Sequence, residues 1–166
     1  MEVMEAIKGR RSIRQYRTTP VTDEAVEQVL EAARQAPSWS NTQCWRFIVV
    51  RDDEIKAALA GTLFDNPATE AIRQTPVVIV ACAELGRAGF RKGQPDTDKG
   101  DWYMFDVALA MQNLVLAAHA LGLGTVHVGR FDAPKAAAVL EVPPGFSVVE
   151  MTPLGYPDQA PQPRPR

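Results

Sequence analysis

The sequence predicts a mixed α/β fold, an α+β arrangement in which strands and helices form layers. Apolar, β-branched runs at 45–50 and 77–81 have the composition of strands, and segments with helical signals separate them. The chain has 166 residues, of which 46% are hydrophobic and 23% charged, and this ordinary composition disfavours disorder, collagen and coiled coil. We therefore expect residues 1–166 to form a single domain around one core.

Helix signals dominate the first forty residues. A short first helix has Val3, Met4 and Ile7 on one side, and a second helix begins after Thr22, where two acidic residues follow the cap position. Pro37 ends this second helix. Its inner face consists of Val26, Val29, Leu30 and Ala33.

Two strands and two short helices follow. Residues 45–50 form the first strand, and the acidic pair at 52–53 can cap a helix that runs to about residue 60. Another helix is expected at 68–74, directly before the run 77–81. Because this run is apolar on both faces, it is typical of a central strand.

One helix dominates the second half of the chain. Residues 84–100 include four glycines without a clear period, and we expect a long surface loop or a broken helix there. Asp101 starts a helix over 102–121 that is apolar nearly all the way round, so it should lie at the centre of the core or of a subunit interface. A short strand at 125–128, a capped helix at 132–140 and a final strand at 146–154 complete the expected fold.

The charge, the cysteines and the N-terminus argue against several classes of protein. A formal net charge of -2 gives no global attraction to nucleic acid or anionic lipid. Cys44 and Cys82 are too few for a disulfide framework and lack neighbours at metal-ligand spacing, so we interpret them as free thiols. The charged N-terminus lacks the apolar core of a signal peptide, and no segment is a comfortable membrane span. We expect a cytoplasmic protein without membrane or nucleic-acid partners.

The densest cluster of cations is the run Arg10-Arg11-Ser12-Ile13-Arg14, where the first helix gives way to a turn. Arginine side chains bind phosphate oxygens with two parallel hydrogen bonds, and a serine hydroxyl adds a neutral donor, so this cluster suits a phosphate. Two alternatives are a solvated helix end and a nucleic-acid-binding arm. The absence of interleaved aromatic residues argues against the arm.

A second candidate is the polar loop at 36–45, which joins a helix to a strand and contains Trp39 and Trp45. Its indoles could stack on a flat, uncharged ligand while its amides and hydroxyls bind the ligand's edge. The alternative is an ordinary polar connection. A phosphate anchor together with an aromatic and amide lining describes a nucleotide-like cofactor.

These motifs, taken in order, resemble the nitroreductase family of FMN-dependent NAD(P)H oxidoreductases, here as a small single-domain member. The resemblance covers nearly the whole chain and implies a dimeric, three-layer fold with a central, mainly antiparallel sheet flanked by helices. The segments that carry it are Arg10–Arg14, Ala36–Ser38, Asn41–Trp45 followed by Phe47–Val50, Gln112–Leu114, Ala117–Ala118, Gly122–Thr125 and Pro153–Pro157.

The resemblance implies roles for the cationic cluster at the cofactor. Arg10 and Ser12 would hold the FMN phosphate, Arg11 would lie along the ribityl chain, and Arg14 would face the pyrimidine edge of the flavin. A cation at that edge favours the reduced flavin, because negative charge develops there on reduction.

The resemblance also implies that the polar loop acts on a second subunit. Family members are homodimers with FMN at the subunit interface, so Pro37, Ser38 and Trp39 would contact the flavin of the partner subunit. Asn41 and Gln43 would shape this loop.

Two further pairs complete the implied FMN site. Val128 and Gly129 fall where the family places backbone N–H groups close to the flavin N5 atom. Arg164 and Arg166 match a basic pair that closes over the phosphate. The proline-rich tail at 157–166 would then be an extended strap that brings these two charges to the site.

The chain departs from the family pattern at several positions. Cys44 stands where the family usually has proline, and we interpret it as a small buried side chain without a redox role. Larger relatives have an asparagine and a lysine that touch the flavin, whereas this chain has Asn66 slightly out of register and Glu70 near the lysine position. His119 and His127 are expected in the core or at an interface.

The implied activity is a hydride transfer from NADH or NADPH through FMN to nitroaromatic, quinone or similar conjugated acceptors in a ping-pong cycle. No catalytic side chain and no metal are expected, because the chemistry takes place at the flavin N5 atom. One alternative is the same FMN scaffold with another redox outcome, such as dehalogenation, dehydrogenation or flavin breakdown. The other is a non-enzymatic flavin-storage or redox-sensing protein.

Overall fold

A three-stranded antiparallel sheet lies at the centre of the molecule. The computed structural model describes residues 1–160, and the strand order in the sheet is β1-β2-β5. The strands are β1 (Trp45–Val50), β2 (Val77–Glu84) and β5 (Phe146–Leu154). The antiparallel sheet and its helices confirm the expected mixed fold.

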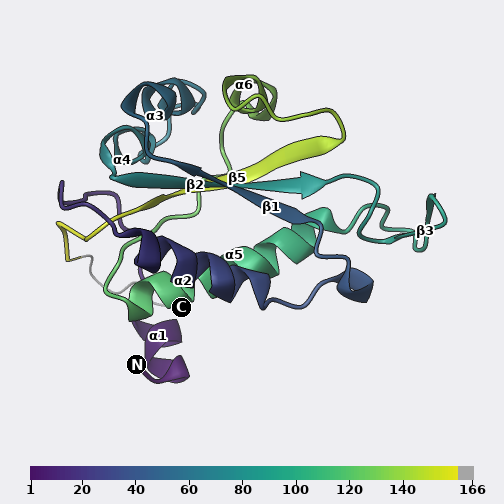
Figure 1. Cartoon of the computed structure of the whole chain (residues 1–166), viewed down its shortest axis with the longest axis horizontal. Helices are drawn as coiled ribbons and strands as arrows, with labels where there is room; N and C mark the ends of the chain where they lie inside the picture. Colours follow the sequence, from purple (N-terminus) through teal and green to yellow (C-terminus); the bar gives the residue numbers. More distant parts are fainter. Residues whose placement is uncertain (161–166) are drawn as a thin grey trace.

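Helices cover both faces of the sheet and make the three layers (Figure 1). One layer contains α2 (Asp23–Arg34) and α5 (Tyr103–Ala120), and the opposite layer contains α3 (Asp53–Ala60), α4 (Thr69–Gln74) and α6 (Ala133–Val139). The short α1 (Val3–Gly9) packs against α5 on the side away from the sheet. Both helical layers therefore pack against the sheet whose middle strand is β2.

The apolar run of β2 explains its central position. All of its side chains from Val77 to Ala83 are buried. Ile79 belongs to the core between the sheet and the layer of α2 and α5, whereas Val80 belongs to the core under α3, α4 and α6. The strand predicted from residues 77–81 is confirmed, and it continues three residues further.

Side-chain caps start several helices where the sequence predicts them. Thr22 accepts a hydrogen bond from the Ala25 amide at 3.3 Å, and the Oδ1 atom of Asp52 accepts from the amides of Glu54 and Ile55 at 2.9 Å. Such caps satisfy amides that have no partner inside the helix.

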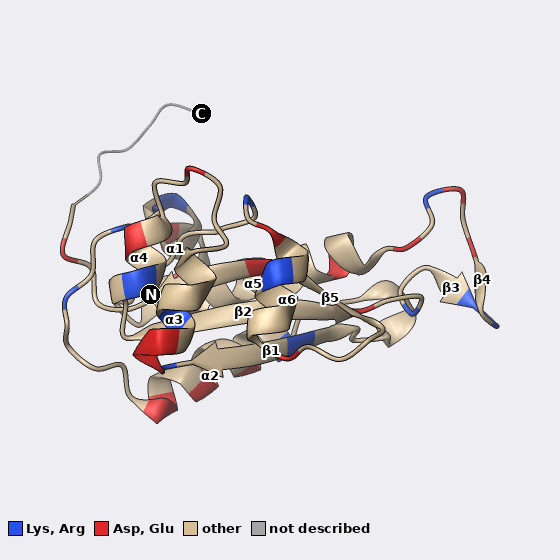
Figure 2. Ribbon diagram, turned by 90° about the horizontal axis from the view of Figure 1, so that it is seen from above, with Lys and Arg blue, Asp and Glu red and all other residues tan. Residues whose placement is uncertain are grey.

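Two segments differ from their expected structure. Residues 125–128 form no strand, because the segment changes partners: Thr125 bridges to Ser12, whereas Val128 bridges to Met151. Residues 84–100 contain a short hairpin of β3 (Phe90–Arg91) and β4 (Gln94–Pro95), which lies at the opposite end of the molecule from α1 (Figures 1 and 2).

The first helix exposes the apolar side that the sequence predicts. Val3 is 70% exposed, Met4 58% and Ile7 44%, and only Ala6 of this helix is buried.

In residues 1–160, no helix is long and apolar enough to cross a membrane.

Candidate functional site

The run Arg10–Arg14, called the cationic segment below, packs beside the C-terminal end of α5. It leaves α1 and runs along residues 122–125, where the amide of Ile13 donates to the Thr125 carbonyl at 2.9 Å. The amide of Arg14 donates to Oε1 of Gln159 at 2.9 Å, so the segment also contacts the chain after β5. Segments from both ends of the described chain therefore meet at this site.

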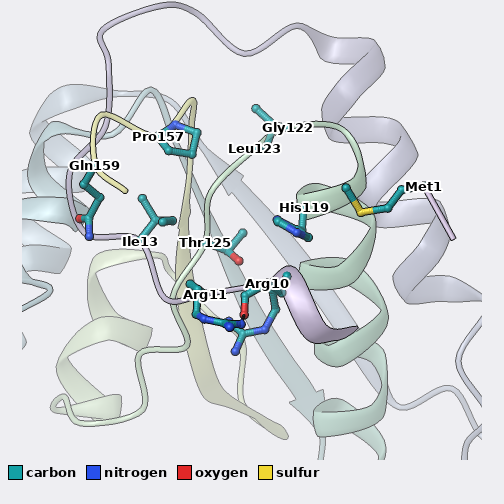
Figure 3. Close-up of a pocket in the computed structure, with 11 residues that line it drawn as sticks. Met1, Arg10, Arg11, Ile13, His119, Gly122, Leu123, Thr125, Pro157 and Gln159 are labelled. Atoms are coloured by element: carbon teal, nitrogen blue, oxygen red, sulfur yellow. Dashed lines mark hydrogen bonds between the residues drawn. The ribbon is translucent and has the colours of Figure 1, made fainter. Parts of the chain in front are cut away.

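A pocket of about 360 Å³ opens between these segments and α5 (Figure 3). The side chains of Arg10 and Arg11 lie next to Thr125 on one side of it. His119 projects from α5 into another wall, and Gln159 lies across from it. The pocket therefore combines two guanidinium groups with polar side chains from three segments.

The electrostatics of this pocket favour an anion. Burial and the neighbouring Arg10 and Arg11 side chains lower the pKa of His119. The Arg11 guanidinium donates to the carbonyls of Lys8 at 2.6 Å and Arg10 at 2.8 Å, which neutralises the end of α1 and fixes the side chain. Arg14 is exposed, and no acidic group among residues 1–160 pairs with it. A phosphate would find charge-assisted donors here.

The segment after Thr125 presents free amides along an open edge. Val128 and Met151 exchange both backbone hydrogen bonds at 3.0 Å, so the Val128 amide is already used inside the chain. Backbone N–H groups alternate in direction along an extended segment, and those of His127 and Gly129 therefore point away from β5. In the described part of the chain neither has an acceptor. Of the two amide donors expected at Val128 and Gly129, the one at Val128 is corrected because it bonds to Met151, whereas the amide of Gly129 stays available, as does that of His127.

The surroundings of Gly129 leave room for a ligand. A Cβ atom added to Gly129 would meet no atom within 4 Å. Asn66 donates from Nδ2 to the Arg130 carbonyl at 3.3 Å, which places it beside this edge despite its shifted register. His127 Nδ1 lies 2.8 Å from Glu150 Oε1, and its side chain is 37% exposed, so it is not a core residue.

The polar loop lies at the other end of α5 and contains a 3-10 turn, η1 (Trp39–Asn41). The Trp39 amide donates to both carboxylate oxygens of Asp106, at 3.0 and 3.1 Å. Inside the loop, the Gln43 amide donates to Ser38 Oγ at 3.0 Å and its Nε2 atom donates to Asn41 Oδ1 at 3.0 Å. Pro37 is exposed at the start of the loop.

Aromatic rings and a buried thiol surround this loop. The Trp39 and Trp102 ring centroids are 5.0 Å apart, and Phe105 meets Trp102 edge-on at 5.4 Å. Cys44 is buried, and burial together with the Asp106 carboxylate raises the pKa of its thiol to about 12. Such a thiol is not a nucleophile at neutral pH. Among residues 1–160, no group of three His, Cys, Asp or Glu side chains could hold a metal ion.

The structure brings together only part of the predicted site. Arg10–Arg14 lie beside Thr125, from which the chain continues to 127–129, but 37–39 lie at the far end of α5. His119 and Asp106 mark the two ends, and they are 13 positions apart in the α-helix, which corresponds to about 20 Å. Arg164 and Arg166 lie outside the described residues.

Asp106 is the main residue that the sequence reasoning missed. It is 1% exposed and lies in the first turn of a helix that is otherwise apolar on its buried side. A carboxylate at a core position needs hydrogen-bond donors from another segment, and this requirement was the available signal. Gln159, which anchors Arg14, had no comparable signal.

Comparisons with known proteins give a consistent picture. The model of the nitroreductase family matches residues 7–70 and 63–156. The chain is 35% identical, over 97% of its length and 80% of the relative, to a protein of Methanothermobacter thermautotrophicus whose name provisionally gives NADH dehydrogenase and NAD(P)H nitroreductase activities. It is 30% identical to an FMN reductase [NAD(P)H] of Bacillus subtilis, over 99% of this chain and 70% of that protein. The crystal structure of a nitroreductase family protein from Clostridium novyi NT has a TM-score of 0.85 and 34% identity, covering 95% of this chain and 86% of that one.

Proposed function

Because this chain belongs to the nitroreductase family, we infer that it is an FMN-dependent NAD(P)H oxidoreductase. One observation supports this activity most directly: Arg10 and Arg11 line an open pocket beside Thr125, and the chain that continues from Thr125 has amides without acceptors in residues 1–160 at His127 and Gly129. FMN carries both a phosphate and a flat ring with polar edges, and these groups offer donors to both parts.

The described residues suggest how FMN is held. Arg10 and Ser12 bind the phosphate, Arg11 lies along the ribityl chain, and Arg14 contributes the exposed cation at the pyrimidine edge. Gly129 offers its amide to the ring and leaves the space that the ring needs. When bound, FMN supplies hydride transfer between NAD(P)H and an acceptor. The protein orients the ring and holds positive charge beside it.

A homodimer completes each site. Pro37, Ser38 and Trp39 of one subunit contact the flavin of the other, because one chain holds this loop about 20 Å from its own cationic segment. Exposed apolar side chains support an interface between two copies on α1 and the start of α5, where Met104 is 57% and Phe105 56% exposed.

Two arginines of the expected phosphate site, Arg164 and Arg166, belong to the tail beyond the described residues. We propose that residues 157–166 extend from the single domain as a strap and bring Arg164 and Arg166 to the phosphate. Its first residues already lie beside the end of the cationic segment. Pro157 bridges to Tyr16, the Asp158 amide donates to the Gln15 carbonyl at 2.9 Å, and Gln159 accepts from the Arg14 amide.

The proposed acceptors are nitroaromatics, quinones or similar conjugated molecules. Trp39, Trp102 and Phe105 form an aromatic surface that suits a flat ring. The sequence has no dinucleotide-binding motif after a strand, so NAD(P)H and the acceptor occupy the same surface in turn. This order of binding gives ping-pong kinetics.

Anaerobic spectroscopy tests the proposal. The purified protein is expected to be yellow, with FMN that denaturation releases, and NADH or NADPH should bleach it before an acceptor restores the colour. A colourless protein that takes up no FMN would contradict the cofactor. A yellow protein that neither nucleotide bleaches would favour flavin storage or sensing.

A further inference from the structure

The loop at 38–44 has an unfavourable backbone conformation at three residues. Ser40, Asn41 and Gln43 have φ values of 42°, 55° and 48°, which lie in the left-handed region. Residues with a Cβ atom adopt this region at a cost in energy, and several of them close together persist only where the surroundings enforce the conformation. We therefore expect contacts from outside the loop to stabilise this conformation in addition to the hydrogen bonds inside it.

Asp106 provides this hold from α5. Both of its carboxylate oxygens accept from the Trp39 amide, the Thr42 hydroxyl donates to Oδ2 at 3.5 Å, and the Cys44 thiol lies 3.8 Å from the same atom. These donors come from the beginning, middle and end of the loop. The carboxylate thus fixes the loop against the helix at three points.

The surroundings of Asp106 point to a role beyond stability. It is 1% exposed, and no Lys, Arg or His in residues 1–160 forms an ion pair with it. Burial raises its pKa, and hydrogen bonds from the loop oppose this effect. Burying a carboxylate without a paired cation is costly, and hydrogen bonds to its oxygens are what offset this cost. Its hydrogen bonds serve the shape of one loop.

A second contact fixes the direction of the Trp39 side chain. The indole lies against Trp102, whose own Nε1 atom donates to Thr97 Oγ1 at 3.2 Å. The backbone of Trp39 is therefore held by Asp106, and its ring is held by a second anchored residue of the same helix end. Trp39 is fixed in position and orientation before any ligand arrives.

We propose that Asp106 is a positioning residue that sets the place of Trp39 at the flavin of the partner subunit. The inference rests on the proposed function, in which this loop reaches the partner's cofactor. Asp106 itself is buried beneath the loop and acts only through it. Loss of its second carboxylate oxygen lets the loop relax, which moves Trp39 while the cationic segment keeps its hold on FMN.

The test compares Asp106→Asn with Asp101→Asn in the full-length holoenzyme. Asp101 also accepts amide hydrogen bonds near the start of α5, from Gly86 at 2.7 Å and Tyr103 at 3.1 Å, but it holds the segment before the hairpin and not the loop. Asp106→Asn is expected to keep the affinity for FMN within about twofold. It should change the visible circular dichroism of the flavin and lower kcat/KM for NADH by about tenfold to a hundredfold, as misplaced groups at a reaction site do. Asp101→Asn should change neither.

Two outcomes overturn the inference. If the wild-type protein binds FMN and is bleached by NADH, but Asp106→Asn matches it in spectrum and kcat/KM, Asp106 does not position Trp39. If Asp101→Asn has the same effect, the helix start matters only for general stability. Where Asp106→Asn fails to fold, Asp106→Glu keeps the charge but shifts its oxygens, and an unchanged flavin spectrum in that variant also contradicts the inference. A wild-type protein that binds no FMN contradicts the proposed function instead.

Discussion

Each end of α5 has one partly or fully buried ionisable side chain, His119 at one end and Asp106 at the other. The surroundings of these two side chains differ in charge and in openness. At the C-terminal end, His119 faces Arg10 and Arg11, and burial together with these guanidinium groups lowers its pKa. At the N-terminal end, burial raises the pKa of Asp106, and its oxygens are occupied by donors from the loop. Positive charge at the first end faces an open pocket, whereas the negative charge at the second is enclosed. The C-terminal end of α5 can therefore bind an anionic ligand, whereas the N-terminal end fixes the conformation of the loop at 38–44.

The middle of α5 should support both ends equally. Leu114 is completely buried between the sheet and α2, so Leu114→Ala leaves a cavity in the shared core. We expect a loss of about 2–5 kcal/mol in the free energy of unfolding, measured by denaturant titration of the apoprotein. Leu85→Ala is the matched control, because Leu85 is 43% exposed and its truncation should change stability little. Equal stability of the two variants would show that α5 is not central to the core.

A substitution in the cationic segment should weaken the binding of FMN without changing the loop at 38–44. Arg14→Ala removes the exposed guanidinium, and the loss of a charge-assisted hydrogen bond worth about 1.5–3 kcal/mol corresponds to FMN binding weaker by about ten- to a hundredfold. Fluorescence titration of the apoprotein with FMN measures this. Arg17→Ala removes another exposed arginine, which forms an ion pair with Asp158 at 3.8 Å, and should keep wild-type affinity. Equal losses in both variants would indicate a general effect of charge.

The same comparison separates what a local sequence can predict from what it cannot. The caps at Thr22 and Asp52 and the buried run of β2 follow from neighbouring residues, and they appear in the structure as expected. The cationic segment was also visible, because its charges are adjacent in sequence. The hydrogen bond from the Trp39 amide to Asp106 cannot be predicted from local sequence, since it joins residues 67 positions apart.

The strand expected at 125–128 is absent from the structure for a similar reason, because it depends on contacts between residues far apart in the sequence. Its composition suits a strand, but pairing requires neighbours, and here Ser12 and Met151 approach it at different residues. The direction of each amide is set by these long-range bridges. For that reason Val128 is lost as an expected donor while Gly129 is kept and His127 is added, a difference that no local sequence pattern reveals.

Mixed dimers should show whether the two ends belong to one site or to two. One subunit carries Arg14→Ala and the other Trp39→Ala, and two affinity tags isolate the mixed species. If each site combines ends from different subunits, one site has both defects and the other has none, so about half of the wild-type NADH turnover remains. If each chain builds its own site, both sites are impaired and turnover falls far below half. A dimer with both changes in one subunit provides the control, and the trans arrangement predicts that its two sites are each impaired.

The smallest expected effect is a change in the titration of His119. The chain has two histidines, so NMR of the ring protons with a His127→Gln variant identifies His119 without ambiguity. Its pKa should lie below the ordinary value, and Arg11→Gln should raise it, because one repelling charge is lost. FMN should raise it as well, since a phosphate beside Arg10 and Arg11 offsets their charge. The unfolded chain binds a proton on this ring at higher pH than the folded chain does. Stability should therefore increase as pH rises through the interval between the two pKa values and decrease as pH falls through it. A His119 pKa that FMN leaves unchanged would place the phosphate away from this end of α5.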